Sequence, residues 1–136
     1  MISQTAEYAL RAIVHLAASG ESCTTQQIAQ DTQAPASYLS KVLQSLTRAE
    51  LVRAQRGLGG GFQLARAASE ITIYDVVQAL NELPRIRECP LGLKEHAQLC
   101  PLHARLDEAI ELVENAFRAT TIAELVDSAH PFIKTN

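Results

Sequence analysis

The sequence predicts a mainly α-helical protein with a small β-hairpin wing, that is, a winged helix-turn-helix followed by a long dimerisation helix. Three observations carry this prediction. Apolar residues recur at helical spacing between residues 3 and 48, and two short strand-like runs then flank a glycine-rich turn. A long amphipathic stretch follows nearer the end of the chain. The length of 136 residues fits one domain of ordinary size with an appended element.

The composition is that of a globular protein with a mostly aliphatic core. Hydrophobic residues make up 47% of the chain, charged residues 20%, and tryptophan is absent. The apolar runs are too short for a membrane helix, and the first residues lack the basic and apolar regions of a signal peptide. We therefore expect a cytoplasmic protein with no membrane partner. Its three cysteines are then more typical of thiols or metal ligands than of a disulfide framework.

Three helices are predicted in the first part of the chain. Residues 3–19 carry apolar residues at helical spacing, and Gly20 provides a stop. Thr24 begins the second helix, with Gln27 three residues later in a capping-box pattern. Pro35 suits the first position of the third helix. The apolar stripe of this third helix consists of Leu39, Val42, Leu43 and Leu46.

A hairpin follows these helices. The runs "LVRAQ" and "GFQLAR" have the composition of short strands, and "RGLGGG" between them is typical of a hairpin tip. Two short helices joined by a tight turn and followed by a two-stranded hairpin indicate a winged helix-turn-helix.

The rest of the chain is predicted to be helical around one irregular segment. Thr72, with Asp75 three residues later, can cap a helix that ends near Pro84. Pro101 can start a long helix that reaches about Thr120, and "TTIAEL" begins a last short one. The long helix has an apolar seam of Leu102, Leu106, Ile110, Val113 and Phe117. This seam favours packing against a second copy in a homodimer; the alternative is that it covers the core of its own domain.

These elements suggest a division of the chain into three parts. Residues 1–83 form the winged helix-turn-helix, residues 84–100 form a ligand-binding loop, and residues 101–136 carry the dimerisation helix and the C-terminal helix.

Charge is distributed unevenly along the chain. The whole chain has a net charge of −3, but residues 35–66 hold five basic residues against one acidic residue, a net +4, which leaves −7 elsewhere. A basic island on an acidic protein is compatible with contacts to phosphate groups, because these depend on local charge.

The helix-turn-helix pattern predicts which side chains reach DNA, since the second helix of this motif enters the major groove. Arg48, near the end of the helix, suits a phosphate contact, and Arg56 in the hairpin suits the minor groove. Consecutive glycines, Gly59 and Gly60 among them, permit a close backbone approach. The side chains expected near base edges are Ser37, Tyr38, Ser40 and Lys41.

Two alternatives to this DNA interface remain open. Lys41 and Arg48 could belong to a solvated helix face. The glycine-rich turn could instead cradle a nucleotide phosphate, although it lacks the Gly-Lys-Ser/Thr ending of a P-loop and lies between strands.

Residues 88–103, "ECPLGLKEHAQLCPLH", form what we call the cysteine segment. Cys100 stands at the start of the long helix, where the helix dipole favours a thiolate, and His103 lies on the same helical face. Cys89 stands upstream in a loop that could fold back. Two thiols and an imidazole suit zinc or an iron–sulfur cluster, but single cysteines and histidines are also common structural residues.

The chain resembles the IscR/NsrR-type winged-helix regulators of the Rrf-two family over nearly its whole length. The matching stretches are "EYALRAIVHLA", "QIAQDTQAPASYLSKVLQSLTRAELVRAQRGLGGGFQLAR", "ITIYDVVQAL", the cysteine segment and "TTIAEL". The resemblance implies a homodimeric transcription factor, usually a repressor, that binds a double-stranded DNA operator. It also implies two iron–sulfur clusters per dimer, each held between the cysteine segment and the N-terminal region of the partner.

The resemblance also implies the ligands. Cys89 and Cys100 match the first and last cluster cysteines of the family, and His103 matches a histidine that some members use. The middle cysteine is replaced by "LKEHAQ", which offers Glu95 or His96. This departure favours a 2Fe–2S cluster with mixed ligands over a 4Fe–4S cluster.

One further ligand is implied at the N-terminus. Glu7 matches a position from which some members supply a carboxylate across the dimer, although it could simply pair with Arg11. Cys23 has no partner in the sequence and is expected to be a core thiol.

The expected function is therefore a regulator whose operator affinity responds to a cluster that senses redox state, nitric oxide or iron supply. The alternatives are a cluster-free regulator of the same fold, which responds to a small molecule, a partner protein or thiol oxidation, and a zinc-stabilised interaction module. An enzyme is not expected, because no nucleophile–base arrangement is evident. The acidic residues of the long helix, Asp107, Glu108, Glu111 and Glu114, are interpreted as a solvated face.

Overall fold

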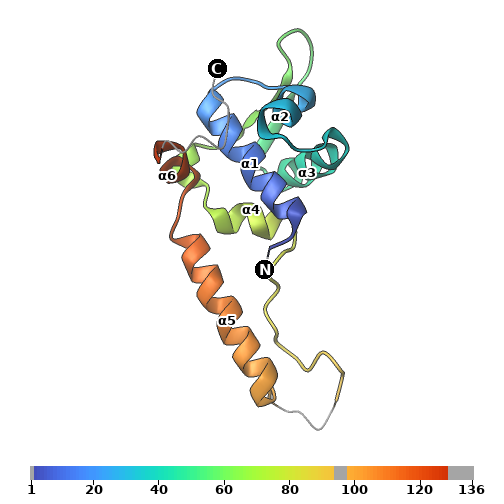
Figure 1. Cartoon of the computed structure of the whole chain (residues 1–136), viewed down its shortest axis with the longest axis vertical. Helices are drawn as coiled ribbons and strands as arrows, with labels where there is room; N and C mark the ends of the chain where they lie inside the picture. Colours follow the sequence, from blue (N-terminus) through green and yellow to red (C-terminus); the bar gives the residue numbers. More distant parts are fainter. Residues whose placement is uncertain (1, 94–97, 129–136) are drawn as a thin grey trace.

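The computed structural model describes residues 2–93 and 98–128. Its elements, in chain order, are α1 (Gln4–Ser19), α2 (Thr25–Thr32), α3 (Ala36–Arg48), β1 (Val52–Gln55), β2 (Gly61–Leu64), the 3-10 turn η1 (Ala68–Glu70), α4 (Ile73–Ala79), α5 (Pro101–Arg118) and α6 (Ile122–Asp127). The first four helices, the hairpin and α6 form one body, from which α5 extends away (Figure 1). The predicted fold class, mainly helical with a small hairpin wing, is confirmed.

Helix α1 lies at the centre of this body and packs against α2, α3, α4, α6 and β2. Its buried face is rich in alanine, and Ala6, Ala9 and Ala12 are fully buried, so neighbouring helices approach closely. The helix begins where the hydroxyl of Ser3 accepts a hydrogen bond from the main-chain N–H of Ala6. It ends at Gly20, whose φ of 68° is the left-handed conformation of a helix C-cap.

Helices α2 and α3 form the helix-turn-helix. The predicted capping box of Thr24 and Gln27 is present at the start of α2. Gln33, with φ 55°, ends α2 and makes the turn tight. Pro35 is the N-cap of α3, one residue before the position predicted for it. The predicted stripe is confirmed as the buried face of α3, namely Leu39, Val42, Leu43 and Leu46.

The wing consists of residues 52–64. Its two strands pair antiparallel, with Val52 opposite Leu64 and Gln55 opposite Gly61. The wing is also attached to the link between α1 and α2, because the main chains of Cys23 and Phe62 exchange hydrogen bonds of 2.9 and 2.8 Å. This attachment fixes the direction in which the hairpin leaves the body.

The chain returns to the core after α5. The main-chain N–H of Ile122 donates to the oxygen of Ile71 at 2.8 Å, and the N–H of Ile73 donates to the oxygen of Thr120 at 3.0 Å. Ile71 and Ile122 are both fully buried. Helix α6 therefore completes the core of the winged body.

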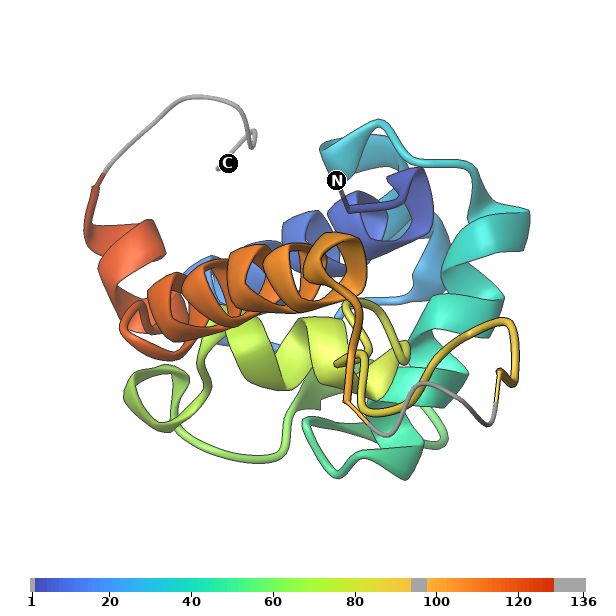
Figure 2. The ribbon, with the colours of Figure 1, turned by 90° about the horizontal axis from the view of Figure 1, so that it is seen from below.

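Helix α5 contains no fully buried residue. The predicted seam divides between two environments: Ile110, Val113 and Phe117 are half-buried, whereas Leu102 and Leu106 are 63% and 46% exposed. Viewed from below, α5 passes in front of α1 and next to α4 (Figure 2). Within the described residues, none of the helices combines the length and the apolar character needed to span a membrane.

Candidate DNA interface and cysteine segment

The outer face of α3 carries the side chains that the sequence predicted for base contacts. Ser37, Tyr38, Ser40 and Lys41 are all exposed there, while the opposite face is buried. Gln44 is exposed on the same side, three residues after Lys41, and was missed by the sequence analysis. Helical spacing alone could have identified it, because residues three or four apart share a face. An amide at this place can read an adenine edge.

Two of these side chains also make contacts within the protein. The hydroxyl of Ser40 donates to the main-chain oxygen of Ala36 at 3.2 Å, which leaves its lone pairs free to accept. The ring of Tyr38 stands 6.0 Å from the ring of Tyr8, at an interplanar angle of 56°. This tilted contact orients Tyr38 at the start of α3, although half of its surface stays exposed.

The tip of the wing is built from glycines with special backbone conformations. Gly57 and Gly59 have φ values of 94° and 75°. A Cβ atom on Gly60 would lie 2.5 Å from the main-chain oxygen of Gln55, so only glycine fits there. Leu58, which the sequence analysis did not select, is fully exposed at this tip.

Basic side chains without an acidic partner gather on α3 and the wing. Among the residues that the structure describes, five arginines form ion pairs with carboxylates: Arg11, Arg66, Arg85, Arg105 and Arg118. Five other basic side chains of the same residues form none, and all but the last lie on α3 or the wing: Lys41, Arg48, Arg53, Arg56 and Arg87. Their charge is available to an anionic partner.

Cys100 and His103 meet at the first turn of α5. The Sγ of Cys100 lies 3.2 Å from Nδ1 of His103, with Cys100 as the N-cap and His103 half-buried. Cys89 is a free thiol of intermediate burial, and among the described residues it forms no hydrogen bond with this pair. Glu95 and His96, the other predicted ligands of the cysteine segment, lie outside the described residues.

The third cysteine, Cys23, is a buried thiol whose Sγ donates to the hydroxyl of Ser19 at 3.4 Å. This agrees with the expectation of a core thiol.

Among the described residues, the donors that converge near Cys100 in one chain are fewer than an iron–sulfur cluster requires. Within residues 2–93 and 98–128, no three His, Cys, Asp or Glu side chains converge as a metal site would require. Cys100 and His103 lie close enough to bind one metal atom together, whereas a cluster takes about four protein ligands. The chemistry of the two thiols of Cys89 and Cys100 and of one imidazole fits a cluster, with donors from a second chain to complete the set.

Glu7 lies in the first turn of α1. Its carboxylate pairs with Arg11 at 3.2 Å and its side chain is 56% exposed. Arg11 also donates to the main-chain oxygen of Thr32 at 3.2 Å and covers the ring of Tyr8. The ion pair considered as the alternative for Glu7 is therefore present, and the carboxylate stays accessible to another chain.

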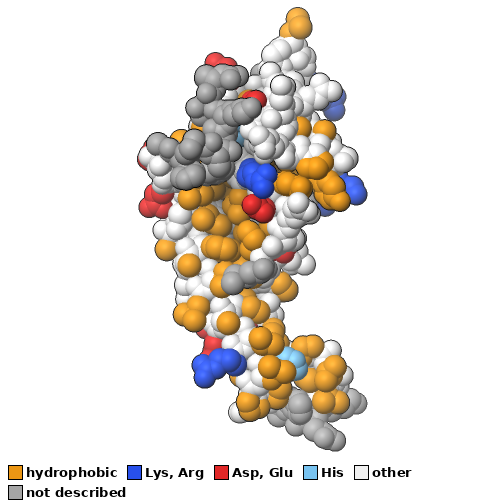
Figure 3. Space-filling model, in the orientation of Figure 1, with side chains coloured by type: hydrophobic (Ala, Val, Ile, Leu, Met, Phe, Trp, Pro, Cys, Tyr) orange, Lys and Arg blue, Asp and Glu red, His pale blue; other side chains and the backbone are white. Residues whose placement is uncertain are grey.

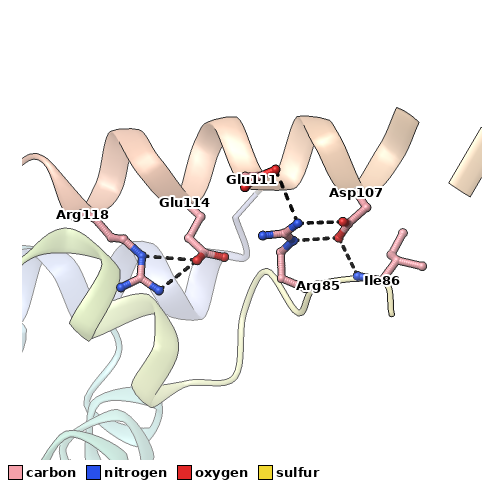
Figure 4. Close-up of polar contacts among 6 residues, drawn as sticks. All are labelled: Arg85, Ile86, Asp107, Glu111, Glu114 and Arg118. Atoms are coloured by element: carbon pink, nitrogen blue, oxygen red, sulfur yellow. Dashed lines mark hydrogen bonds and ion pairs between the residues drawn. The ribbon is translucent and has the colours of Figure 1, made fainter. Parts of the chain in front are cut away.

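A bidentate ion pair joins the chain after α4 to α5. Nε and Nη2 of Arg85 donate to the two carboxylate oxygens of Asp107 at 2.8 and 2.7 Å, and the N–H of Ile86 donates to the same carboxylate at 2.8 Å (Figure 4). Glu111 lies 3.6 Å from the same guanidinium. Hydrogen bonding by Arg85 lowers the pKa of Asp107 to about 2, although desolvation opposes the shift. The same bond raises the pKa of Arg85.

The interpretation of the acidic residues on α5 as a solvated face is wrong for two of them. The side chains of Asp107 and Glu114 are only 15% and 13% exposed. Asp107 is held by Arg85, and Glu114 pairs with Arg118, whose guanidinium lies 3.7 Å above the ring of Tyr74. Tertiary contacts that α5 makes with α4 and the following segment explain the difference.

The fold and the basic outer face of α3 and the wing define the class of winged helix-turn-helix DNA-binding proteins. The model of the Rrf2 family, described as iron-dependent transcriptional regulators, matches residues 2–128, and the chain belongs to this family. The resemblance stated from the sequence is confirmed, and the class is that of transcriptional regulators, not enzymes.

Individual relatives agree with this assignment. The Mycobacterium tuberculosis (strain ATCC 25618 / H37Rv) protein Rv1287, which is named as an HTH-type transcriptional regulator, is 35% identical over 136 residues, covering 96% of this chain and 83% of that protein. The structure of CymR, the global cysteine regulator of B. subtilis, superposes with a TM-score of 0.78 at 21% identity, covering 96% and 98% of the two chains. T. potens IscR gives a TM-score of 0.78 at 21% identity, covering 100% and 93%. At these identities the two structures establish a shared fold.

Proposed function

We propose that the protein is a homodimeric transcriptional repressor whose affinity for its operator is controlled by an iron–sulfur cluster that senses redox state, nitric oxide or iron supply. The proposal assigns DNA binding to residues 1–83, cluster binding to residues 84–100 and dimerisation to residues 101–136. The observation that carries it is the Cys100–His103 pair at the start of α5, in a chain where four of the five described basic side chains without a carboxylate partner lie on α3 and the wing.

DNA binding is assigned to the outer face of α3 and to the wing. Ser37, Tyr38, Ser40 and Lys41 are exposed toward the side from which a major groove would approach, and Arg48 stands at the end of the helix. Arg56 stands just before the glycine turn, where Gly59 and Gly60 allow the backbone to come close to a minor groove. Among the residues that the structure describes, none of these cations has a carboxylate partner, so binding to phosphates would break none of the described ion pairs.

The dimer contact is assigned to α5. Five apolar side chains are exposed along one side of this helix: Leu102, Leu106, Ala109, Leu112 and Ala116. Hydrophobic side chains form a stripe along the helix in the space-filling view (Figure 3). An apolar helix face of this length is covered well by the same face of a second copy, because the contact is then self-complementary.

The cluster ligands are assigned to both chains. Cys89, Cys100 and His103 of one chain, with His96 as a further donor, would be completed by Glu7 of the other chain. Fewer thiolates than four favour a 2Fe–2S cluster, whose potential rises when nitrogen or oxygen ligands replace sulfur. The family description as iron-dependent supports iron over zinc.

The chain's own residues would transmit the signal. A cluster, when bound, supplies redox chemistry and a link between subunits that oxidation or nitric oxide can break. Glu7, on α1 next to α3, would then hold its winged body at a set distance from the partner's cysteine segment. Because a dimer must match the spacing of two half-sites, release of Glu7 would loosen this spacing and weaken operator binding.

The test is an absorption spectrum of the anaerobically purified protein, with iron and sulfide analysis and operator binding measured before and after treatment with nitric oxide. Visible absorption with equal iron and sulfide is the expected result. A Cys89→Ala, Cys100→Ala variant should lose both the colour and the dependence of binding on treatment. If this variant keeps its iron and its response, the cluster assignment is wrong.

A cluster-free regulator that responds through its thiols is the second candidate. The contact between Cys100 and His103 favours it, because an imidazole beside a thiol at a helix start is an arrangement typical of reactive cysteines. A colourless protein whose DNA binding changes reversibly with disulfide reagents would support this candidate over the first.

A further inference from the structure

The ion pair of Arg85 and Asp107 differs from most others in the chain. Three of the other pairs join residues three or four apart on one helix and include an exposed partner: Glu7–Arg11, Arg105–Glu108 and Glu114–Arg118. Arg85 and Asp107 are instead 22 residues apart and both side chains are largely buried, at 20% and 15% exposed. The pair is bidentate, and the Ile86 N–H donates to the same carboxylate. A bidentate pair of this kind fixes the orientation of the two side chains as well as the distance between them.

The Arg85–Asp107 pair lies at a similar distance along the chain path from Cys89 on one side and from Cys100 on the other. Ile86 is held at Asp107, and an extended chain from Ile86 to Cys89 reaches about 10 Å over three residues. Along α5, the seven residues from Asp107 back to Cys100 also span about 10 Å. The chain after α4 runs toward the N-terminal end of α5 (Figure 1), so both lengths run in the same direction from the ion pair. The length from Ile86 to Cys89 therefore equals the length from Asp107 to Cys100.

We infer that Arg85 and Asp107 are positioning residues for Cys89, which hold the chain in the register that brings Cys89 level with Cys100 and His103. The inference rests on the proposed function only in taking these cysteines as the functional groups. Neither Arg85 nor Asp107 touches a sulfur atom; both act through the path of the backbone. Without the pair, the chain before Cys89 would lose this attachment to α5, and Cys89 would sample a larger volume around Cys100.

The effective concentration of Cys89 for Cys100 measures this positioning directly. The full chain is equilibrated without metal, in EDTA and under argon, with defined ratios of reduced and oxidised glutathione. The two thiols lose two protons and two electrons to form the disulfide, and oxidised glutathione takes them up to give two molecules of the reduced form. Mass mapping of peptides quantifies the Cys89–Cys100 disulfide separately from Cys23.

Four variants make the measurement decisive. Asp107→Asn removes the negative charge of the pair. Arg85→Lys keeps the positive charge but cannot form the bidentate contact. Glu108→Gln, at the next residue of the same helix and in an exposed pair, is the matched control. Exchange of the two partners, Arg85→Asp with Asp107→Arg, tests for rescue. Circular dichroism melting identifies any variant that does not fold.

The expected result is a fall of about tenfold in effective concentration for Asp107→Asn and Arg85→Lys, no change for Glu108→Gln, and partial recovery in the exchanged variant. If Asp107→Asn does not fold, Arg85→Lys decides the question. If Asp107→Asn or Arg85→Lys is folded and has the same effective concentration of Cys89 for Cys100 as the wild type, the inference is wrong. No iron and no DNA enter the measurement, so its outcome is independent of whether the protein binds a cluster.

Discussion

The guanidinium of Arg11 donates to the main-chain oxygen of Thr32, so a side chain of α1 is bound to the last residue of α2. The same guanidinium pairs with Glu7 and covers the ring of Tyr8, which contacts Tyr38 on α3. The proposed carboxylate ligand therefore shares one cation with the turn of the helix-turn-helix. A change in the state of Glu7 has a short physical route to the helix that would read DNA.

Replacement of Glu7 by Gln separates its two assigned roles. The pair with Arg11 is exposed and lies within one helix, so its loss should change the free energy of unfolding by less than about 0.5 kcal/mol. If Glu7 is a cluster ligand for the second chain, the same variant should also lose iron and sulfide per dimer after anaerobic reconstitution. Urea unfolding and iron analysis of the same preparation measure both. Unchanged iron content would remove Glu7 from the ligand set.

Removal of single cations from the proposed DNA face should weaken binding in a salt-dependent way. Arg48→Ala and Arg56→Ala should each reduce the slope of log affinity against log salt by about one, because each gives up one phosphate contact. The probe is a duplex selected from a random pool with the wild-type protein. Arg105→Ala on α5 is the matched control, since its arginine is exposed but pairs with Glu108. Equal slopes for all three variants would count against the assigned face.

Two glycines of the wing should respond differently to alanine. Gly61 has φ 145°, and a Cβ atom there would lie 2.4 Å from the main-chain oxygen of Cys23. Gly61→Ala should therefore destabilise the protein by about 2–3 kcal/mol, as strain and close contact add. Gly59 has φ 75° but nothing within 4 Å of a Cβ atom, so Gly59→Ala should cost only about 1 kcal/mol. Denaturant unfolding of both variants measures the difference; equal losses would show that the wing does not need its close approach to Cys23.

A charge on the exposed face of α5 should prevent dimerisation. Leu106→Glu places a carboxylate within the apolar stripe, where burial in a dimer contact would carry a large desolvation penalty. Light scattering after size-exclusion chromatography should then give the monomer mass instead of the dimer mass. Glu111→Gln, on the same helix but outside the stripe, should leave the mass unchanged. A dimer of Leu106→Glu with wild-type stability would place the contact elsewhere.

Acid should release the contact between Arg85 and Asp107. The pKa of Asp107 in the folded protein is about 2, below its ordinary value of 3.8, so the pair contributes stability that is present above about pH 4. This contribution is lost as the pH falls from about 4 toward 2. Asp107→Asn should therefore be less stable than the wild type at pH 7, and the difference should narrow over this window in urea unfolding. A constant difference down to pH 2 would contradict the assignment of the pKa shift.

Local sequence patterns were sufficient for the helices and the wing. The stripe of Leu39, Val42, Leu43 and Leu46 has helical spacing, and burial of an apolar stripe is what fixes a helix on its domain. Capping boxes at Thr24 and Thr72 are likewise local signals and are present where the sequence placed them. The start of α5 at Pro101 follows from the same kind of local rule.

Contacts between distant residues were not predictable in this way. Asp107 stands in a row of carboxylates that looks solvated in the sequence, and only the path of the chain after α4 brings Arg85 to it. The hydrogen bonds of Cys23 with Phe62, and the contact of Tyr8 with Tyr38, also depend on how the elements pack. For the candidate site, the sequence supplied the residue types and the shared helical face of Cys100 and His103, whereas the direct contact between Sγ and Nδ1 needed the structure.

Because the chain returns to the core after α5, the winged body cannot be cut from the rest of the chain at the end of α4 without loss of stability. Ile122 is fully buried and its main chain is paired with Ile71, although 51 residues separate them. A fragment that stops after α4 would expose this face of the core and lose two main-chain hydrogen bonds. A winged body cut off after α4 would therefore be less stable than the same body with α6 in place, so the winged body and the helix that begins at Cys100 fold as one unit.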